Sequence, residues 1–163
     1  MTITREIEAK LQEQDPGNAV LGALRKLFAN DVYLLIVDAN ERSICYRFAM
    51  YLQEELPTFD VDCEYNRDGI EPKRLAHLDL HPDSHDTDAK TVFPDVIAHI
   101  RGKKENYLVM EFKKSSSTVS HDVDFLKLSG YKRNNNLGYQ YALFVELTVG
   151  EQPGIARVEW INA

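Results

Sequence analysis

The stretch FPDVIAHIRGKKENYLVMEFK, residues 93–113, decides the fold of this chain, because it joins two apolar segments through a short polar turn. Residues 92–100 and 107–113 are rich in β-branched and aromatic side chains, and residues 101–105 form the turn. This pattern is typical of a β-hairpin. In an antiparallel hairpin centred on residue 103, Asp95 and Glu111 are predicted to lie opposite each other on one face of the sheet.

The chemistry expected at this hairpin follows from the charges that it brings together. Lys113, two residues beyond Glu111, shares the face of the facing carboxylates, whereas the alternate positions point into the core, namely Leu108, Met110 and Phe112. Facing carboxylates repel unless a cation lies between them, and Mg²⁺ sites use one or two carboxylates with water and substrate phosphate. An adjacent lysine can stabilise charge on a phosphoryl group. The three residues therefore predict phosphodiester hydrolysis; the alternative is a cross-strand charge cluster on a solvated face.

The rest of the chain is predicted to form an N-terminal helical segment followed by a mixed α/β region. Hydrophobic periodicity and end signals predict helices at residues 3–13, 18–29, 38–56 and 118–133, with Asp38 as an N-cap. Strands are predicted at residues 32–37, 59–65, 92–100, 107–113, 139–149 and 155–161. Residues 68–90 are polar and rich in turn formers, so we expect a long mobile loop there. This order predicts one mixed sheet with helices on its faces.

Phe93-Pro94-Asp95, followed after 15 residues by Glu111-Phe112-Lys113 on a strand, resembles the PD-(D/E)XK nuclease superfamily, the restriction-endonuclease-like group. The resemblance covers residues 38–148, where the order of elements also matches, and residues 61–67 are similar to a segment of small uncharacterised bacterial members. It implies an α/β fold with an αβββαβ core and a mixed central sheet flanked by helices. Residues 1–30 would then form an N-terminal helical extension, and residues 31–163 the nuclease-like domain.

The resemblance also implies a set of site residues. Asp95 and Glu111 would bind Mg²⁺, or Mn²⁺ in its place, with the backbone carbonyl of Phe112 as a further ligand. Lys113 would be the catalytic lysine, and Glu41, from the helix before the first core strand, would be an additional catalytic and metal-binding carboxylate. For Glu41 the alternative is a capping box with Asp38, in which both side chains only satisfy the start of the helix.

The implied partner is nucleic acid, with DNA expected before RNA. Candidate contacts to it are Lys114, Lys127, Arg67 and Lys132, and for the lysines of the later helix a solvated face is the alternative. The rival function is a catalytically inactive member that binds nucleic acid or protein, since fold does not fix function. A chain of this size has little room to read sequence, so we expect action on structure or ends, a homodimer or a partner protein.

Composition limits these functions further. The chain has 163 residues, enough for one domain, and carries 19 Lys and Arg against 26 Asp and Glu, a net charge of −7. Residues 101–133 alone have eight basic and four acidic residues, a local charge of +4. No apolar run is long enough to span a membrane, and two cysteines favour free thiols in the cytoplasm. The acidic balance argues against tight non-specific coating of nucleic acid. We expect incidental surface side chains, rather than ligands of a second metal site, at His81, Asp83, His85, Asp86 and Asp88.

Overall fold

A five-stranded mixed sheet lies at the centre of the computed structural model, which describes residues 3–65, 67–68, 71–72, 74–75, 90–91, 93–134 and 137–162. Its strands, in spatial order, are β1 (Asp60–Cys63), β6 (Val96–Ile100), β7 (Glu105–Lys114), β8 (Tyr141–Thr148) and β9 (Gly154–Trp160). Strands β7 and β8 are parallel, and every other neighbouring pair in this sheet is antiparallel. The predicted α/β class with one mixed sheet is therefore confirmed.

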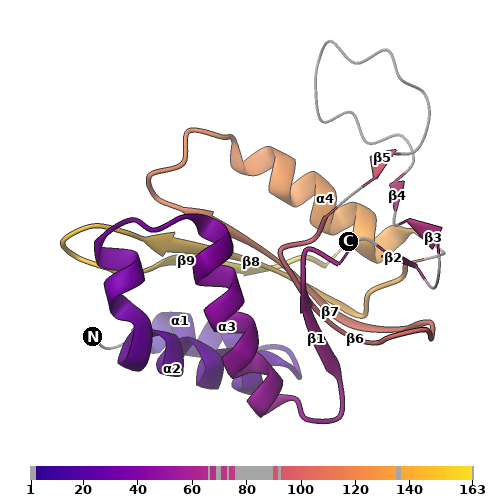
Figure 1. Cartoon of the computed structure of the whole chain (residues 1–163), viewed down its shortest axis with the longest axis horizontal. Coiled ribbons are helices and arrows are strands. Elements are labelled where there is room, and N and C mark those ends of the chain that lie inside the picture. Colours follow the sequence, from indigo (N-terminus) through magenta and orange to yellow (C-terminus); the bar gives the residue numbers. More distant parts are fainter. Residues whose placement is uncertain are drawn as a thin grey trace.

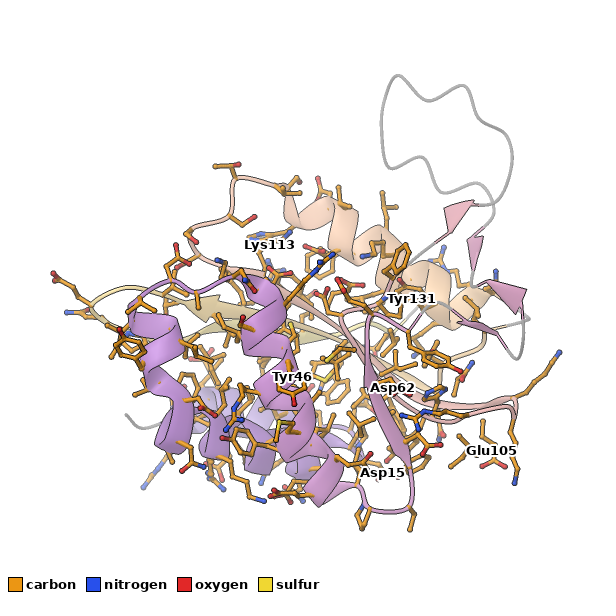
Figure 2. All side chains as sticks on the ribbon, viewed as in Figure 1. Asp15, Tyr46, Asp62, Glu105, Lys113 and Tyr131 are labelled. Atoms are coloured by element: carbon orange, nitrogen blue, oxygen red, sulfur yellow. The ribbon has the colours of Figure 1, made fainter. Side chains whose placement is uncertain are left out.

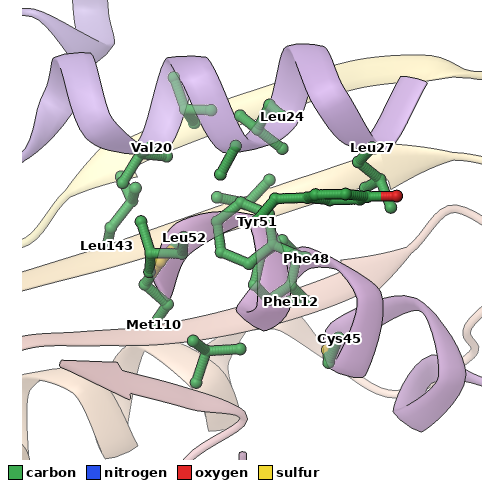
Figure 3. Close-up of a cluster of buried hydrophobic side chains, with 14 of the residues drawn as sticks. Val20, Leu24, Leu27, Cys45, Phe48, Tyr51, Leu52, Met110, Phe112 and Leu143 are labelled. Atoms are coloured by element: carbon green, nitrogen blue, oxygen red, sulfur yellow. The ribbon is translucent and has the colours of Figure 1, made fainter. Parts of the chain in front are cut away.

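Within the described residues, four helices cover the two faces of this sheet (Figure 1). They are α1 (Arg5–Leu11), α2 (Gly17–Ile36), α3 (Glu41–Glu55) and α4 (His121–Arg133). The larger core lies between α1–α3 and one face, where Met110 and Phe112 of β7 pack with Phe48 of α3 (Figure 3). On the opposite face, Val109 packs with Leu128 of α4. Strand β7 therefore separates two cores, because successive side chains point to opposite faces.

The hairpin register is the one that the sequence predicts. Val96 pairs with Met110 and Ala98 with Leu108, so the index sum is 206 on this part of the ladder. Continued by one step, the register sets Asp95, which precedes β6, opposite Glu111. The ladder shifts between Ala98 and His99, and this irregularity stays at the turn end of the hairpin. Strand β6 begins at Val96, so the strand expected from residue 92 is shorter than predicted.

Residues 32–36 are helical and Val37 is the C-cap, so the strand predicted at residues 32–37 is wrong. Helix α2 continues to Ile36 through a kink at Asp31, whose backbone leaves the helical conformation (φ −129°, ψ 22°). The Asp31 carboxylate is held from α3 by Arg47, at 3.0 Å, and by the Tyr51 hydroxyl, while Leu35 beyond the kink is fully buried. Tertiary contacts thus override the β-branched content of this segment. The expected boundary at residue 30 falls inside α2.

The start of α3 also differs from the prediction. Asn40, not Asp38, is the N-cap, and its side-chain oxygen accepts a hydrogen bond from the Ser43 amide at 2.8 Å. Asp38 lies outside the helix with φ 51°. Glu41 is the first helical residue, so the capping box that was its alternative role is absent.

The segment expected to be a loop, residues 68–90, contains strand pairs at its described ends. β2 (Arg67–Asp68) pairs with β3 (Glu71–Pro72), and β4 (Arg74–Leu75) pairs with β5 (Lys90–Thr91). The loop prediction is wrong at these positions, and residues 76–89, with all five residues of the weaker metal candidate, lie outside the described residues. Within the described part of the chain, no helix is long and apolar enough to cross a membrane.

Candidate active site

The predicted site residues meet where β7 runs beyond its last pair with β6 while still paired with β8, between the N-terminal end of α3 and the inner face of α4. Glu111 and Lys113 project from β7 toward α4, because their neighbours Met110 and Phe112 occupy the core on the other face. Figure 2 labels Lys113 on this strand and Tyr131 on the helix that covers it. Antiparallel pairing brings Asp95 to the same place from the start of β6. The alternation of side chains along β7 and the antiparallel register of β6 therefore bring Glu111, Lys113 and Asp95 together.

Asp95 and Glu111 form a hydrogen-bonded carboxyl pair. Their side chains bond to each other, and the Phe112 amide donates to Asp95 Oδ2 at 2.8 Å. Burial raises the pKa of both carboxyls, and for Glu111, which is only 1% exposed, the negative charge of Asp95 raises the pKa further. Two full negative charges at this place are therefore disfavoured, and a cation close to both carboxyls would stabilise them.

Lys113 is held by a residue that the sequence analysis did not single out. Its ammonium lies 2.7 Å from Asp124 Oδ2 on α4, and both side chains are buried. Ser120 caps this helix by accepting from the Asp122 amide, which sets the first turn. The spacing of Asp124, Leu128 and Tyr131 places them on one helical face, and this spacing was the available signal for Asp124.

Lys127, which the sequence predicts to contact nucleic acid or to lie on a solvated face, points into the site. Its ammonium lies 3.0 Å from Glu111 Oε1, and its side chain is 17% exposed. Burial alone would lower the pKa of Lys127, but the interaction with Glu111, together with the charges of Asp95 and Asp124, outweighs burial and the net shift is upward. Lys127 is therefore a charged partner of the carboxyl pair.

Glu41 lies on the other side of Asp95. Burial, followed by the charge of Asp95, raises the pKa of Glu41 to about 7. Both carboxylates line a cavity of about 60 Å³, with the remaining wall formed by Arg42, Cys45, Cys63 and Glu64. The two cysteines are free thiols, as predicted, and burial raises the pKa of Cys63 to about 11. A carboxylate with this pKa is suited to exchange protons near neutral pH.

The other candidate nucleic-acid contacts lie away from this cavity or are engaged by protein groups. The Lys114 ammonium is 2.9 Å from both Asp38 Oδ1 and the Ala39 carbonyl, and so ties β7 to the α2–α3 connection. Lys132 donates to the Ile161 carbonyl at 3.0 Å. Arg67 is part of β2, but its side chain is outside the described residues.

The donor set at this site fits a hard divalent ion. Among the described residues, no three His, Cys, Asp or Glu side chains converge as a finished metal site. Mg²⁺ and Mn²⁺ sites need fewer protein ligands, however, because water and substrate oxygens complete them. The Phe112 amide points to Asp95, and its carbonyl lies on the same edge of the strand, since both groups of a strand residue point to one side. Two carboxyls with raised pKa and a carbonyl are oxygen donors of the required kind.

Fold and site together define an α/β protein with a mixed sheet and a buried carboxylate–lysine cluster at the end of its central hairpin. Comparisons of the chain with family models, with curated proteins and with solved structures found no match.

Proposed function

We propose that this protein is a metal-dependent nuclease of the PD-(D/E)XK kind, which hydrolyses phosphodiester bonds of nucleic acid, with DNA as the first substrate to test. The proposal rests mainly on the hydrogen-bonded pair of Asp95 and Glu111, with Lys113 two residues further along β7. The order α3, β1, β6, β7, α4, β8 supports it, because this is an αβββαβ arrangement with β2–β5 inserted after β1.

Each residue of the cluster has a distinct role in such a reaction. Asp95, Glu111 and the Phe112 carbonyl would hold Mg²⁺ or Mn²⁺, which supplies Lewis-acid polarisation of a phosphodiester oxygen when bound. The Lys113 ammonium, kept in place by Asp124, stabilises negative charge that builds on the phosphoryl group. Glu41, with its pKa near 7, accepts the proton of the attacking water on its carboxylate.

The test is cleavage of labelled double-stranded DNA, single-stranded DNA and RNA with Mg²⁺ or Mn²⁺, with EDTA as the blank. We expect Lys113→Ala to lose about 100-fold or more in rate, a loss typical of removing one charge-stabilising donor. Lys103→Ala is the matched control, since Lys103 is exposed at the far end of β7, about 30 Å away along the strand. Retained cleavage in Lys113→Ala would contradict the assignment.

Folding needs a separate check, because Lys113→Ala leaves Asp124 buried without its partner. Asp95→Asn is therefore the second variant: its amide keeps an acceptor for the Phe112 amide and gains a donor for Glu111. We expect Asp95→Asn to remain folded by circular dichroism and to lose cleavage together with Mn²⁺ binding.

A second candidate function is a catalytically inactive module that binds nucleic acid or protein. One observation favours it, namely that both lysines of the site are already paired with carboxylates, as in a purely structural ion-pair cluster. Calorimetric titration with Mn²⁺ separates the two functions. Binding that disappears in Asp95→Asn supports the nuclease, whereas no Asp95-dependent binding supports the module.

A further inference from the structure

The site carries more negative than positive charge. Two ammonium groups face four carboxyl groups, those of Glu41, Asp95, Glu111 and Asp124. In the metal-free protein the Lys127 ammonium lies 3.0 Å from Glu111 Oε1. A divalent ion at Asp95 and Glu111 must therefore compete with an internal cation.

The two lysines differ in how firmly they are held. Lys113 and Asp124 are both enclosed, with side chains 9% and 8% exposed and a separation of 2.7 Å. Lys127 reaches Glu111 at 3.0 Å from a more open position, with 17% of its side chain exposed against 2% for Glu111. Because a lysine side chain is long and flexible, Lys127 can turn toward solvent while Lys113 stays in place.

The contact between Lys127 and Glu111 is an ion pair on a buried oxygen. Among the described residues, Glu111 Oε1 and Asp124 Oδ2 are both buried without a well-directed hydrogen bond, although a lysine ammonium lies within ion-pair distance of each. A buried carboxylate oxygen left in this state retains its capacity for a further ligand. Glu111 Oε1 is therefore an oxygen for which an ion and Lys127 compete.

We propose that Lys127 is a built-in cation that neutralises Glu111 in the metal-free protein and is displaced from Glu111 when a divalent ion binds. This inference rests on the proposed function, since it assigns the ion to Asp95 and Glu111. Lys127 thereby weakens the affinity of the site for the ion, and its ammonium is set free at the mouth of the site in the loaded state.

The sign of the effect follows from the charges. A divalent ion held by Asp95 and Glu111 would lie close to the ammonium of Lys127, and the positive charges repel each other. Removing the ammonium therefore favours the ion. A lysine that helps to bind the ion would instead weaken ion binding on removal.

The experiment is calorimetric titration of the metal-free protein with MnCl₂, and separately with MgCl₂, without nucleic acid. Lys127→Met keeps the apolar stem and removes the charge. We expect about tenfold tighter Mn²⁺ binding for this variant, within the range typical of coupled sites. Lys132→Met is the matched control on the same helix, because it makes the same change in net charge and Lys132 contacts a backbone carbonyl. Its affinity should equal that of the unmodified protein.

Thermal unfolding with and without Mn²⁺ gives a second readout. The rise in Tm on adding Mn²⁺ should be larger for Lys127→Met than for the unmodified protein, and Lys127→Gln provides the same comparison if the methionine variant does not fold. Unchanged or weaker Mn²⁺ binding in the Lys127 variants overturns the inference and leaves the proposed function standing. Absence of binding in every form contradicts the proposed function itself.

Discussion

Single residues of this protein are placed for chemistry at a cost to the fold, and Asp95 is the clearest case. Its carboxyl lies against that of Glu111, and burial raises the pKa of both groups. Such a contact destabilises the metal-free chain, because one group must stay protonated or the two charges repel. Strained arrangements of this kind persist where function requires them.

Asp95→Asn should therefore stabilise the metal-free protein at neutral pH. The amide can accept from the Phe112 backbone and donate to Glu111, so the pair no longer needs a proton. We expect a gain of about 1 kcal/mol, which corresponds to a rise of about 2–4 °C in Tm for a chain of this length. Calorimetric unfolding in EDTA measures it, with Glu151→Gln, an exposed acidic position, as the charge-matched control. A lower Tm for Asp95→Asn would show that the carboxyl pair is not a source of repulsion.

Asp62 shows the opposite arrangement at a residue outside the site. Burial alone would raise its pKa, but hydrogen bonds from His99, at 2.7 Å, and from Arg101 outweigh burial and hold the pKa well below the usual range. A carboxyl with a lowered pKa in the folded state stabilises the fold above its unfolded pKa, and this stabilisation is lost as the pH falls.

Asp62→Asn should consequently lower the free energy of unfolding by about 1–2 kcal/mol at pH 7, the size expected for hydrogen bonds to a charged group of which one partner is exposed. The difference from the unmodified protein should narrow as the pH falls below about 4, where Asp62 becomes protonated in the unfolded chain. Urea unfolding at several pH values measures this. A difference that stays constant down to pH 3 would contradict the assigned pKa shift.

Whole elements position the site through their ends as well as through their faces. Helix α3 delivers Glu41 in its first turn, and its start is set by the bond from the Ser43 amide to the Asn40 side chain. Helix α4 delivers Asp124 and Lys127 from one face after the Ser120 cap. The site thus depends on where two helices begin.

Asn40→Ala should lower stability by about 1 kcal/mol, since it removes the N-cap of α3, whereas Asn40→Ser retains a capping oxygen and should cost much less. If Glu41 acts in the reaction, cleavage by Asn40→Ala should also fall more than cleavage by Asn40→Ser. Thermal unfolding and the cleavage assay on the same samples test both statements. Equal stability of the two variants would show that the cap has no part in holding α3.

At the scale of the whole molecule, the N-terminal helices belong to the same core as the sheet. Leu24 and Leu27 of α2 are buried with Phe112 and Leu143 of the central strands (Figure 3). Helix α1 is held against β9, where the Trp160 indole donates to the Lys10 carbonyl at 2.9 Å. The described residues 3–30 therefore share a packed interior with the rest of the described chain.

Unfolding should accordingly be a single cooperative transition. Fluorescence of Trp160, the only tryptophan, reports the contact between α1 and β9, and far-ultraviolet circular dichroism reports the whole chain. We expect the two denaturation curves to coincide in urea, as they do for a two-state domain. A fluorescence transition at lower urea would show that the N-terminal segment detaches first.

The distribution of charge is also a property of the whole molecule. The eight basic residues in 101–133 are dispersed. Arg101, Lys103 and Lys104 are exposed at the hairpin turn, whereas Lys113 and Lys127 are paired inside the site. The remaining three lie elsewhere: Lys114 contacts Asp38, Lys132 donates to the Ile161 carbonyl, and Arg133 is exposed at the end of α4. The basic segment therefore does not form one continuous surface for phosphate.

The sequence alone determined the central hairpin and the residues that face each other across it. Alternation and the position of the turn are local properties, so the index sum that pairs Asp95 with Glu111 could be worked out without a structure. The α/β class followed for the same reason, since each long periodic segment carries its own signal.

Only the tertiary structure decided how the site is completed. Residues 32–37 have strand-like composition but form the end of a helix and its C-cap, because Asp31 is bound by α3 and Leu35 is buried. Asp124 and Lys127 are separated from β7 in sequence and became part of the site only when α4 packed on the sheet. Contacts between distant segments, unlike periodicity, leave no local pattern, and so the partners of Lys113 and Glu111 could not be read from the chain alone.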